Sequence, residues 1–160
     1  MFSPRLCGEN FFMFQEVSTE LLSAGYSVRF RPGGQSMHPT IRDGERITVE
    51  PILAEQVRTG DIILYAAARG PVAHRVVRVE RREAQSALFH LRGDCAATPD
   101  APVVAAQILG RVVSVEREGR VIALTGPRAR LRRVARRALA SLKVLGRTVL
   151  QRRPRFPLGI

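Results

Sequence analysis

Short runs of alternating apolar and polar residues dominate the first 126 positions of the chain. Alternation over about four to eight residues predicts half-buried β-strands. The segments that fit, mostly separated by glycine or proline, are residues 27–31, 46–50, 62–65, 72–80, 87–92, 108–116 and 120–124. Residues 62–65 are nearly all apolar, which predicts a strand buried on both faces. Glu118-Gly119 predicts a hairpin turn between the last two strands. The pattern therefore predicts a mainly β fold.

Two other segments repeat apolar residues every three or four positions, the periodicity of an amphipathic helix. The first is short and covers residues 14–24. The second carries an apolar stripe from Leu131 to Val149, with arginines on its other positions. We therefore divide the chain into a β domain, residues 1–126, and a basic amphipathic helical tail, residues 127–160.

The positive charge lies in this tail. The chain has 26 basic and 14 acidic residues, a formal net charge of +12. All 14 acidic residues lie at or before Glu118, where they balance 14 basic residues. The twelve basic residues that follow Glu118 therefore account for the net positive charge. A cationic amphipathic helix suits contact with anionic lipid, and we expect peripheral membrane contact through residues 127–153. Packing of the apolar stripe on the β domain is an alternative. Nucleic acid as a partner has no support beyond charge.

The apolar pattern predicts neither a membrane span nor a secretory signal. The longest N-terminal apolar run, Phe11–Phe14, is far shorter than the roughly 20 residues of a spanning helix or the roughly 7 to 15 of a signal core. Two cysteines, Cys7 and Cys95, do not suggest a disulfide framework. We expect a cytoplasmic protein that is at most peripheral to the membrane. The sequence leaves its oligomeric state open.

Candidate chemistry begins in the segment Gly34-Gln35-Ser36-Met37-His38-Pro39-Thr40. Its glycine allows unusual backbone angles and its proline restrains the turn after the serine. The segment resembles the serine-nucleophile box of the signal peptidase superfamily, G-x-S-M-x-P-T. Most bacterial members of that superfamily use a lysine as general base. The single lysine here, Lys143, lies in the basic tail, so another residue must accept the proton of Ser36.

His74, in Val72-Ala73-His74-Arg75-Val76-Val77, is the candidate general base. A serine hydroxyl is a poor nucleophile near neutral pH and needs a base within hydrogen-bond reach. A half-buried core histidine is the alternative interpretation. Of the other histidines, His38 holds the variable position of the serine box, and His90 is expected to face solvent. A histidine base resembles the histidine-dependent archaeal and endoplasmic-reticulum branch of signal peptidases.

The segment from Gly93-Asp94 to Asp100 is similar to the G-D-x-x-x-x-x-D box of that family. By this resemblance Asp100 would orient His74, while Asp94 would organise the loop or share that catalytic role. In the alternative interpretation both aspartates only cap backbone amides of a turn.

Gly60-Asp61-Ile62-Ile63 matches the family's G-D-[IV]-[IV] strand. In relatives this strand lines the cleft, and the substrate adds to it as an extended strand. The resemblance also implies that the backbone amide of Ser36 binds the oxyanion. The residues expected to bind substrate or the oxyanion are Gly34, Gln35, Met37, Ile62 and Ile63.

Four such boxes occur in family order over residues 34–100. Together they imply a signal-peptidase-like or repressor-protease-like β fold and a serine endopeptidase that cleaves a peptide or precursor protein through an acyl-enzyme. Small residues would be preferred before the scissile bond, and no metal or cofactor is implied. One alternative is a self-cleaving repressor-type peptidase, which would use a lysine base. Another is a catalytically silent peptide-binding or maturation-partner module.

Overall fold

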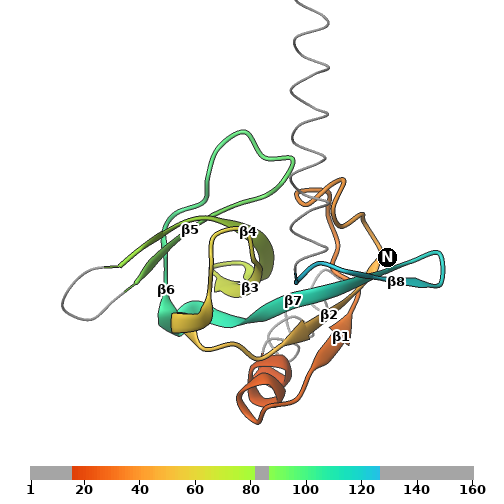
Figure 1. Cartoon of the computed structure of the whole chain (residues 1–160), viewed down its shortest axis with the longest axis horizontal. Coiled ribbons are helices and arrows are strands. Elements are labelled where there is room, and N and C mark those ends of the chain that lie inside the picture. Colours follow the sequence, from red (N-terminus) through yellow and green to blue (C-terminus); the bar gives the residue numbers. More distant parts are fainter. Residues whose placement is uncertain (1–15, 82–86, 127–160) are drawn as a thin grey trace, which may run out of the picture. The chain divides into compact units, whose positions relative to one another are not determined.

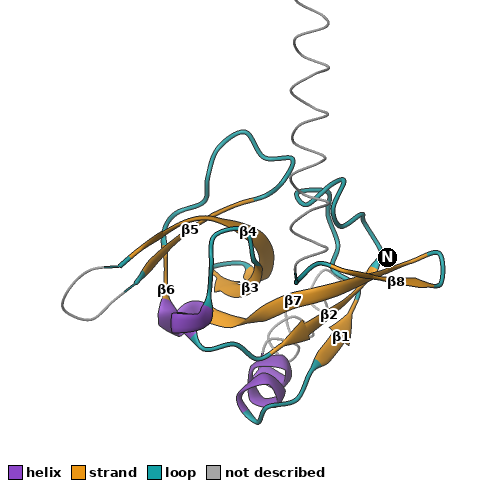
Figure 2. Ribbon diagram, viewed as in Figure 1, coloured by secondary structure: helices purple, strands orange, loops and turns teal. Residues whose placement is uncertain are grey.

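The structure is a computed structural model that describes residues 16–81 and 87–126 (Figures 1 and 2). The chain divides into two compact units, residues 1–125 and residues 126–160. The tail of residues 127–160, with Lys143 and the membrane contact predicted for residues 127–153, lies outside the described residues. Cys7 and Phe11–Phe14 also lie outside them. No helix within the described ranges is long and apolar enough to cross a membrane.

The described residues form an antiparallel sheet of eight strands, so the mainly β prediction is confirmed. The strands and short 3-10 helices are β1 (Val28–Phe30), β2 (Arg46–Glu50), η1 (Ala54–Gln56), β3 (Ile62–Ala67), β4 (Gly70–Glu80), β5 (Leu88–Arg92), β6 (Val103–Val104), η2 (Ala105–Gln107), β7 (Ile108–Arg117) and β8 (Arg120–Ala123). Seven of these strands match the alternating segments of the sequence to within a few residues. The two-residue β6 and both 3-10 helices were not predicted, because they are too short to carry a period.

Two turns have the backbone geometry that their sequences require. At the hairpin between β7 and β8, Glu118 has a φ of 51° and Gly119 a φ of 73°, as a two-residue turn with both central residues left-handed demands. The N-terminal helix is described over residues 16–23, and it ends where Gly25 takes a φ of 88° and donates its amide hydrogen to the carbonyl oxygen of Leu22. A glycine adopts this left-handed conformation without the strain that a Cβ causes.

The strand order is β1-β2-β7-β3-β4-β5-β6, with β8 paired to β7 (Figure 1). The late strand β7 therefore lies between β2 and β3. Its first residues pair with β3 and its last residues with β8. This order places β3 and β4 in the interior of the sheet. It also sets β4, which carries His74, beside β5, whose end leads into the loop of Asp94 and Asp100.

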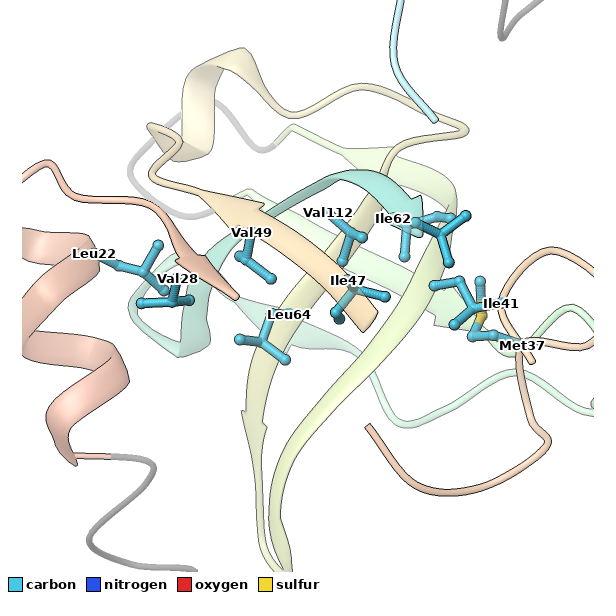
Figure 3. Packing of buried hydrophobic residues seen from close by; sticks show 10 residues of the cluster. Leu22, Val28, Met37, Ile41, Ile47, Val49, Ile62, Leu64 and Val112 are labelled. Carbon is cyan, nitrogen blue, oxygen red and sulfur yellow. The ribbon is translucent and has the colours of Figure 1, made fainter. Parts of the chain in front are cut away.

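The apolar strand β3 separates two hydrophobic clusters. Ile62 and Leu64 belong to the first cluster, whereas Ile63 and Tyr65 belong to the second. Successive side chains of a strand point to opposite faces, so the prediction of burial on both faces is confirmed. Figure 3 shows the first cluster, in which Leu22 of the N-terminal helix packs with strand residues.

The loop between β1 and β2 is anchored in this first cluster. Met37 and Ile41 of the loop are buried there together with Ile62 (Figure 3). Complete burial of such a side chain contributes about 1.5–3 kcal/mol. Because Met37 is adjacent to Ser36, the anchor restrains the serine backbone while the Ser36 side chain stays at the surface.

Candidate active site

Ser36, His74 and Asp100 form a continuous hydrogen-bonded line across three segments of the chain. The Ser36 Oγ lies 2.9 Å from His74 Nε2, and His74 Nδ1 lies 2.5 Å from Asp100 Oδ2. Ser36 comes from the β1–β2 loop, His74 from β4 and Asp100 from the loop after β5. A carboxylate can only accept, so Nδ1 carries the proton and Nε2 is left to accept the serine hydroxyl hydrogen.

Two backbone hydrogen bonds hold the loops in this arrangement. The amide of Asp100 donates to the carbonyl oxygen of Leu91 at 2.9 Å, which ties the aspartate to the end of β5. The amide of Cys95 donates to the carbonyl oxygen of Ser36 at 2.8 Å, which joins the aspartate loop to the serine loop. Both hydrogen bonds fix the main chain of the two loops. The positions of Ser36 and Asp100 relative to His74 therefore follow from the backbone conformation of these loops.

Gly93 makes the closest approach to the site. A Cβ at this position would lie 2.7 Å from the carbonyl oxygen of Ser36, 3.1 Å from the Ser36 Cβ and 3.2 Å from His74 Nε2. A Cβ only 2.7 Å from a backbone oxygen is much closer than van der Waals contact allows. Any larger residue here must therefore displace the serine loop, and glycine is required by space rather than by backbone angle. The sequence places Gly93 only at the start of the Gly-Asp box and does not indicate this close packing.

Asp94 binds Arg75, the residue that follows His74 in β4. Its two carboxylate oxygens accept hydrogen bonds from Arg75 Nε at 2.7 Å and Nη2 at 2.6 Å. The hydroxyl of Thr40 donates to the same carboxylate, and Arg75 Nη1 donates to the carbonyl oxygen of Gly60. This network joins the serine loop, the start of β3, β4 and the aspartate loop. Of the two roles expected for Asp94, the contacts favour organisation of the loop.

Arg75 is buried: its side chain is only 11% exposed and is paired with Asp94. Arg78, further along β4, is exposed. His90 was expected to face solvent, but it is half-buried and its Nε2 lies 3.3 Å from Glu80 Oε2. His38 is exposed.

The five residues expected to bind substrate or the oxyanion lie in different environments. The side chains of Met37, Ile62 and Ile63 are buried in the hydrophobic clusters. Gly34, with a φ of 102°, donates its amide hydrogen to Asp43 Oδ1 at 2.7 Å, so this amide is already paired. Gln35 is exposed beside Ser36.

Strand β3 is paired on both sides at the position expected to receive substrate. Ile63 is opposite His74 of β4 on one side and Arg111 of β7 on the other. Leu64 and Tyr65 are likewise paired with both neighbours. From Ile63 to Tyr65, β3 therefore has no free edge for an added strand, whereas Ile62 is paired with Arg75 of β4 and lies before the pairing with β7 begins.

Tyr65 adjoins the triad, although its sequence context suggested only a core position. Its ring centroid lies 6.3 Å from that of His74, with the ring planes tilted by 54°. Burial raises the pKa of Tyr65 to about 12, and the negative charge of Asp100 acts in the same direction. The available signal was a tyrosine within an otherwise apolar strand, since a buried phenol needs a polar partner.

The triad is separate from a surface cavity of about 360 Å³. That cavity is lined by Arg31, residues 42–46 and residues 116–119, all of which are charged residues or glycines. Within the described ranges there is no group of three or more His, Cys, Asp or Glu side chains that could hold a metal ion.

In comparisons with known proteins, no family model and no curated protein matches this chain.

Proposed function

We propose that the chain is a serine endopeptidase, with a mechanism like that of the histidine-dependent signal peptidases. The observation that carries the proposal is the line from Ser36 Oγ through His74 to Asp100, with separations of 2.9 and 2.5 Å. A nucleophile hydrogen-bonded to a base, and a base hydrogen-bonded to an orienting carboxylate, are the elements of triad catalysis. Three separate segments must converge to produce this geometry.

In the proposed reaction, Ser36 Oγ attacks the carbonyl carbon of a peptide bond while His74 Nε2 takes the hydroxyl proton. Asp100 accepts the Nδ1 hydrogen bond and stabilises the imidazolium that forms. Collapse of the tetrahedral intermediate breaks the C–N bond, and His74 returns its proton to the leaving amine. Water then attacks the acyl-enzyme by the same route, which releases the acid and restores Ser36.

The Ser36 amide remains the candidate oxyanion donor. It has no acceptor among the described residues, whereas the Gly34 amide is committed to Asp43. An unpaired amide next to the nucleophile suits the charge that develops on the carbonyl oxygen. The substrate class is a peptide or precursor protein that presents an extended segment to the exposed Ser36. By resemblance, small residues would be preferred before the cleaved bond.

The test is cleavage of a complex peptide mixture by the purified chain, read as new termini by mass spectrometry. We expect recurrent cleavage positions that disappear with Ser36→Ala. The exposed loop position makes the cost of this substitution in stability small, so the variant should melt close to the wild type. Identical cleavage by the wild type and Ser36→Ala would remove Ser36 from the mechanism. Absence of cleavage by both, with no acylation of Ser36, would favour a catalytically silent peptide-binding module.

A further inference from the structure

Ser36 lies in a segment of the β1–β2 loop whose backbone is tied together by two overlapping turns. The amide of His38 donates to the carbonyl oxygen of Gln35 at 3.0 Å. The amide of Ile41 donates to the carbonyl oxygen of Met37 at 3.0 Å. Because the turns overlap, a contact that holds the end of this segment also restrains the backbone of Ser36.

Arg117, the last residue of β7, makes such a contact. Its Nη2 lies 3.2 Å from the carbonyl oxygen of Thr40 and 3.4 Å from that of Pro39. The same guanidinium binds both carboxylate oxygens of Glu45, through Nε to one oxygen and through Nη2 to the other at 2.9 Å. Glu45 also accepts the backbone amide of Arg42 at 2.8 Å. One arginine therefore links the serine loop to the residues just before β2.

The pair of Arg117 and Glu45 is largely buried and charged. The two side chains are 17% and 11% exposed. The hydrogen bond from Arg117 lowers the pKa of Glu45 below its usual value, so the carboxylate is ionised at neutral pH. Desolvation offsets much of the attraction in such a pair. A fork of two hydrogen bonds does fix the plane of the guanidinium, and here that plane also directs Nη2 at the loop carbonyls.

Thr40 is held from two strands. Arg117 of β7 binds its carbonyl oxygen, while Nη2 of Arg75 in β4 lies 3.3 Å from its hydroxyl oxygen. The hydroxyl itself donates to Asp94. The Arg75 contacts join the serine loop to the aspartate loop, whereas the Arg117 contacts join it to the β7–β8 hairpin. Removal of Arg117 would leave the main chain of Thr40 without its anchor on this hairpin.

We propose that Arg117 is a positioning residue of this site, which holds the backbone of the serine loop so that Ser36 stays within hydrogen-bond reach of His74. The effect on catalysis rests on the proposed peptidase function, whereas the clamp itself rests on the described contacts. Arg117 acts through the main chain of the loop. It lies in a strand far from the serine box in sequence, so no local pattern indicates this role.

The clamp is tested by hydrogen exchange, measured by mass spectrometry on peptides that cover residues 35–45. In Arg117→Ala we expect these amides to exchange about tenfold faster than in the wild type, because the loop opens more often. Arg46→Ala is the matched control, since Arg46 is paired with Glu116, which keeps Arg29 as a partner. Unchanged exchange in Arg117→Ala, or equal acceleration in Arg46→Ala, would overturn the clamp.

The consequence for catalysis is measured with a fluorophosphonate probe that reacts with Ser36, well below the melting temperature of each variant. Arg117→Ala should lower the maximal labelling rate by about tenfold, because the serine is less often in the reactive position. The probe concentration that gives half of this rate should not change, and Arg46→Ala should label like the wild type. A loss of stability with labelling at the wild-type rate would show that Arg117 is only structural.

Arg117→Lys keeps the proposal testable if Arg117→Ala does not fold. Lysine retains the charge and the apolar stem, but an ammonium group cannot bind the carboxylate and two carbonyl oxygens in the same fork geometry. Labelling should therefore slow by about threefold, and wild-type labelling and exchange in Arg117→Lys would overturn the proposal. A wild-type chain that resists the probe would overturn the proposed function instead, and hydrogen exchange would still decide the clamp.

Discussion

His74 and Arg75 are consecutive residues of β4, and each binds a different aspartate of one loop. His74 contacts Asp100 and leads outward to the exposed Ser36. Arg75 contacts Asp94 and leads inward to Thr40 and Gly60. The alternation of a strand sends the two side chains to opposite faces. A single Gly-Asp box thus supplies carboxylates to two networks.

The two networks differ in what their central residue can do. Histidine exchanges a proton near neutral pH, so the network of His74 can carry out acid–base chemistry. Arginine stays protonated, so the network of Arg75 can only hold its partners in place. Arg75 directs bidentate hydrogen bonds at Asp94, the geometry in which such a pair is strongest. We infer that the Asp94 network serves stability and the Asp100 network serves reaction.

The largest expected difference is in the rate of turnover. Asp100→Asn should lower peptide cleavage by about 10⁴-fold, because an amide cannot stabilise the imidazolium and disturbs the tautomer. Its melting temperature should stay near that of the wild type. Kinetic assays of folded Asp100→Asn and Asp94→Asn would check the ranking. If Asp94→Asn were the slower enzyme, the two aspartates would have to exchange roles.

A second difference is expected in stability. Asp94→Asn removes one partner of a pair whose side chains are 11% and 17% exposed. Loss of one member of a buried ion pair costs about 3–5 kcal/mol, and the residual exposure here places the expected loss at about 2–4 kcal/mol. Denaturant unfolding, with Asp100→Asn as the matched control, measures this directly. Equal midpoints for the two variants would contradict a structural role for Asp94.

A substitution of Gly93 tests whether both networks depend on the close contact between the aspartate loop and the serine loop. Gly93→Ala should lower turnover by about 100-fold, because a Cβ 2.7 Å from the Ser36 carbonyl oxygen displaces the serine loop. Overpacking of this kind also costs about 1–3 kcal/mol of stability. Gly33→Ala is the matched control, since the nearest atom to a Cβ there is 4.0 Å away. If both variants had wild-type turnover, the close packing at Gly93 would not matter for the reaction.

The smallest effect is on stability at alkaline pH. The pKa of Tyr65 is raised to about 12 in the folded protein, above its unfolded value of about 10. The contribution of Tyr65 to stability is therefore complete below about pH 10 and is lost as the pH rises toward 12. Tyr65→Phe should make stability less dependent on pH in this window, whereas Tyr26→Phe should not. Parallel curves for wild type and Tyr65→Phe would show that the phenol is not linked to folding.

Local pattern was enough to predict most strands, and the resemblance of three boxes to the signal peptidase superfamily supplied the triad candidates. Alternation located β2 at its observed ends, and the serine, histidine and aspartate boxes named residues that the fold brings together. The insertion of β7 between β2 and β3 could not be predicted in this way, because pairing across such a distance depends on the whole sheet. The pairing of Ile63 with both β4 and β7 could not be predicted for the same reason.

The role of Asp94 also needed the fold. The resemblance implied that Asp100 orients His74, but it left Asp94 between organising the loop and sharing that catalytic role. The choice depends on the burial of Arg75 and its pairing with Asp94, which the sequence did not indicate. The close approach of Gly93 and the contact of Tyr65 likewise depend on neighbours distant in sequence.

The most direct test of a histidine-activated serine is the intact mass of the protein after reaction with a fluorophosphonate. The wild type and Lys143→Ala should each gain one adduct at Ser36 at the same rate, since the single lysine plays no part in the proposed mechanism. His74→Ala and Ser36→Ala should gain none over the same time. Labelling of His74→Ala at the wild-type rate, or loss of labelling in Lys143→Ala, would contradict the account.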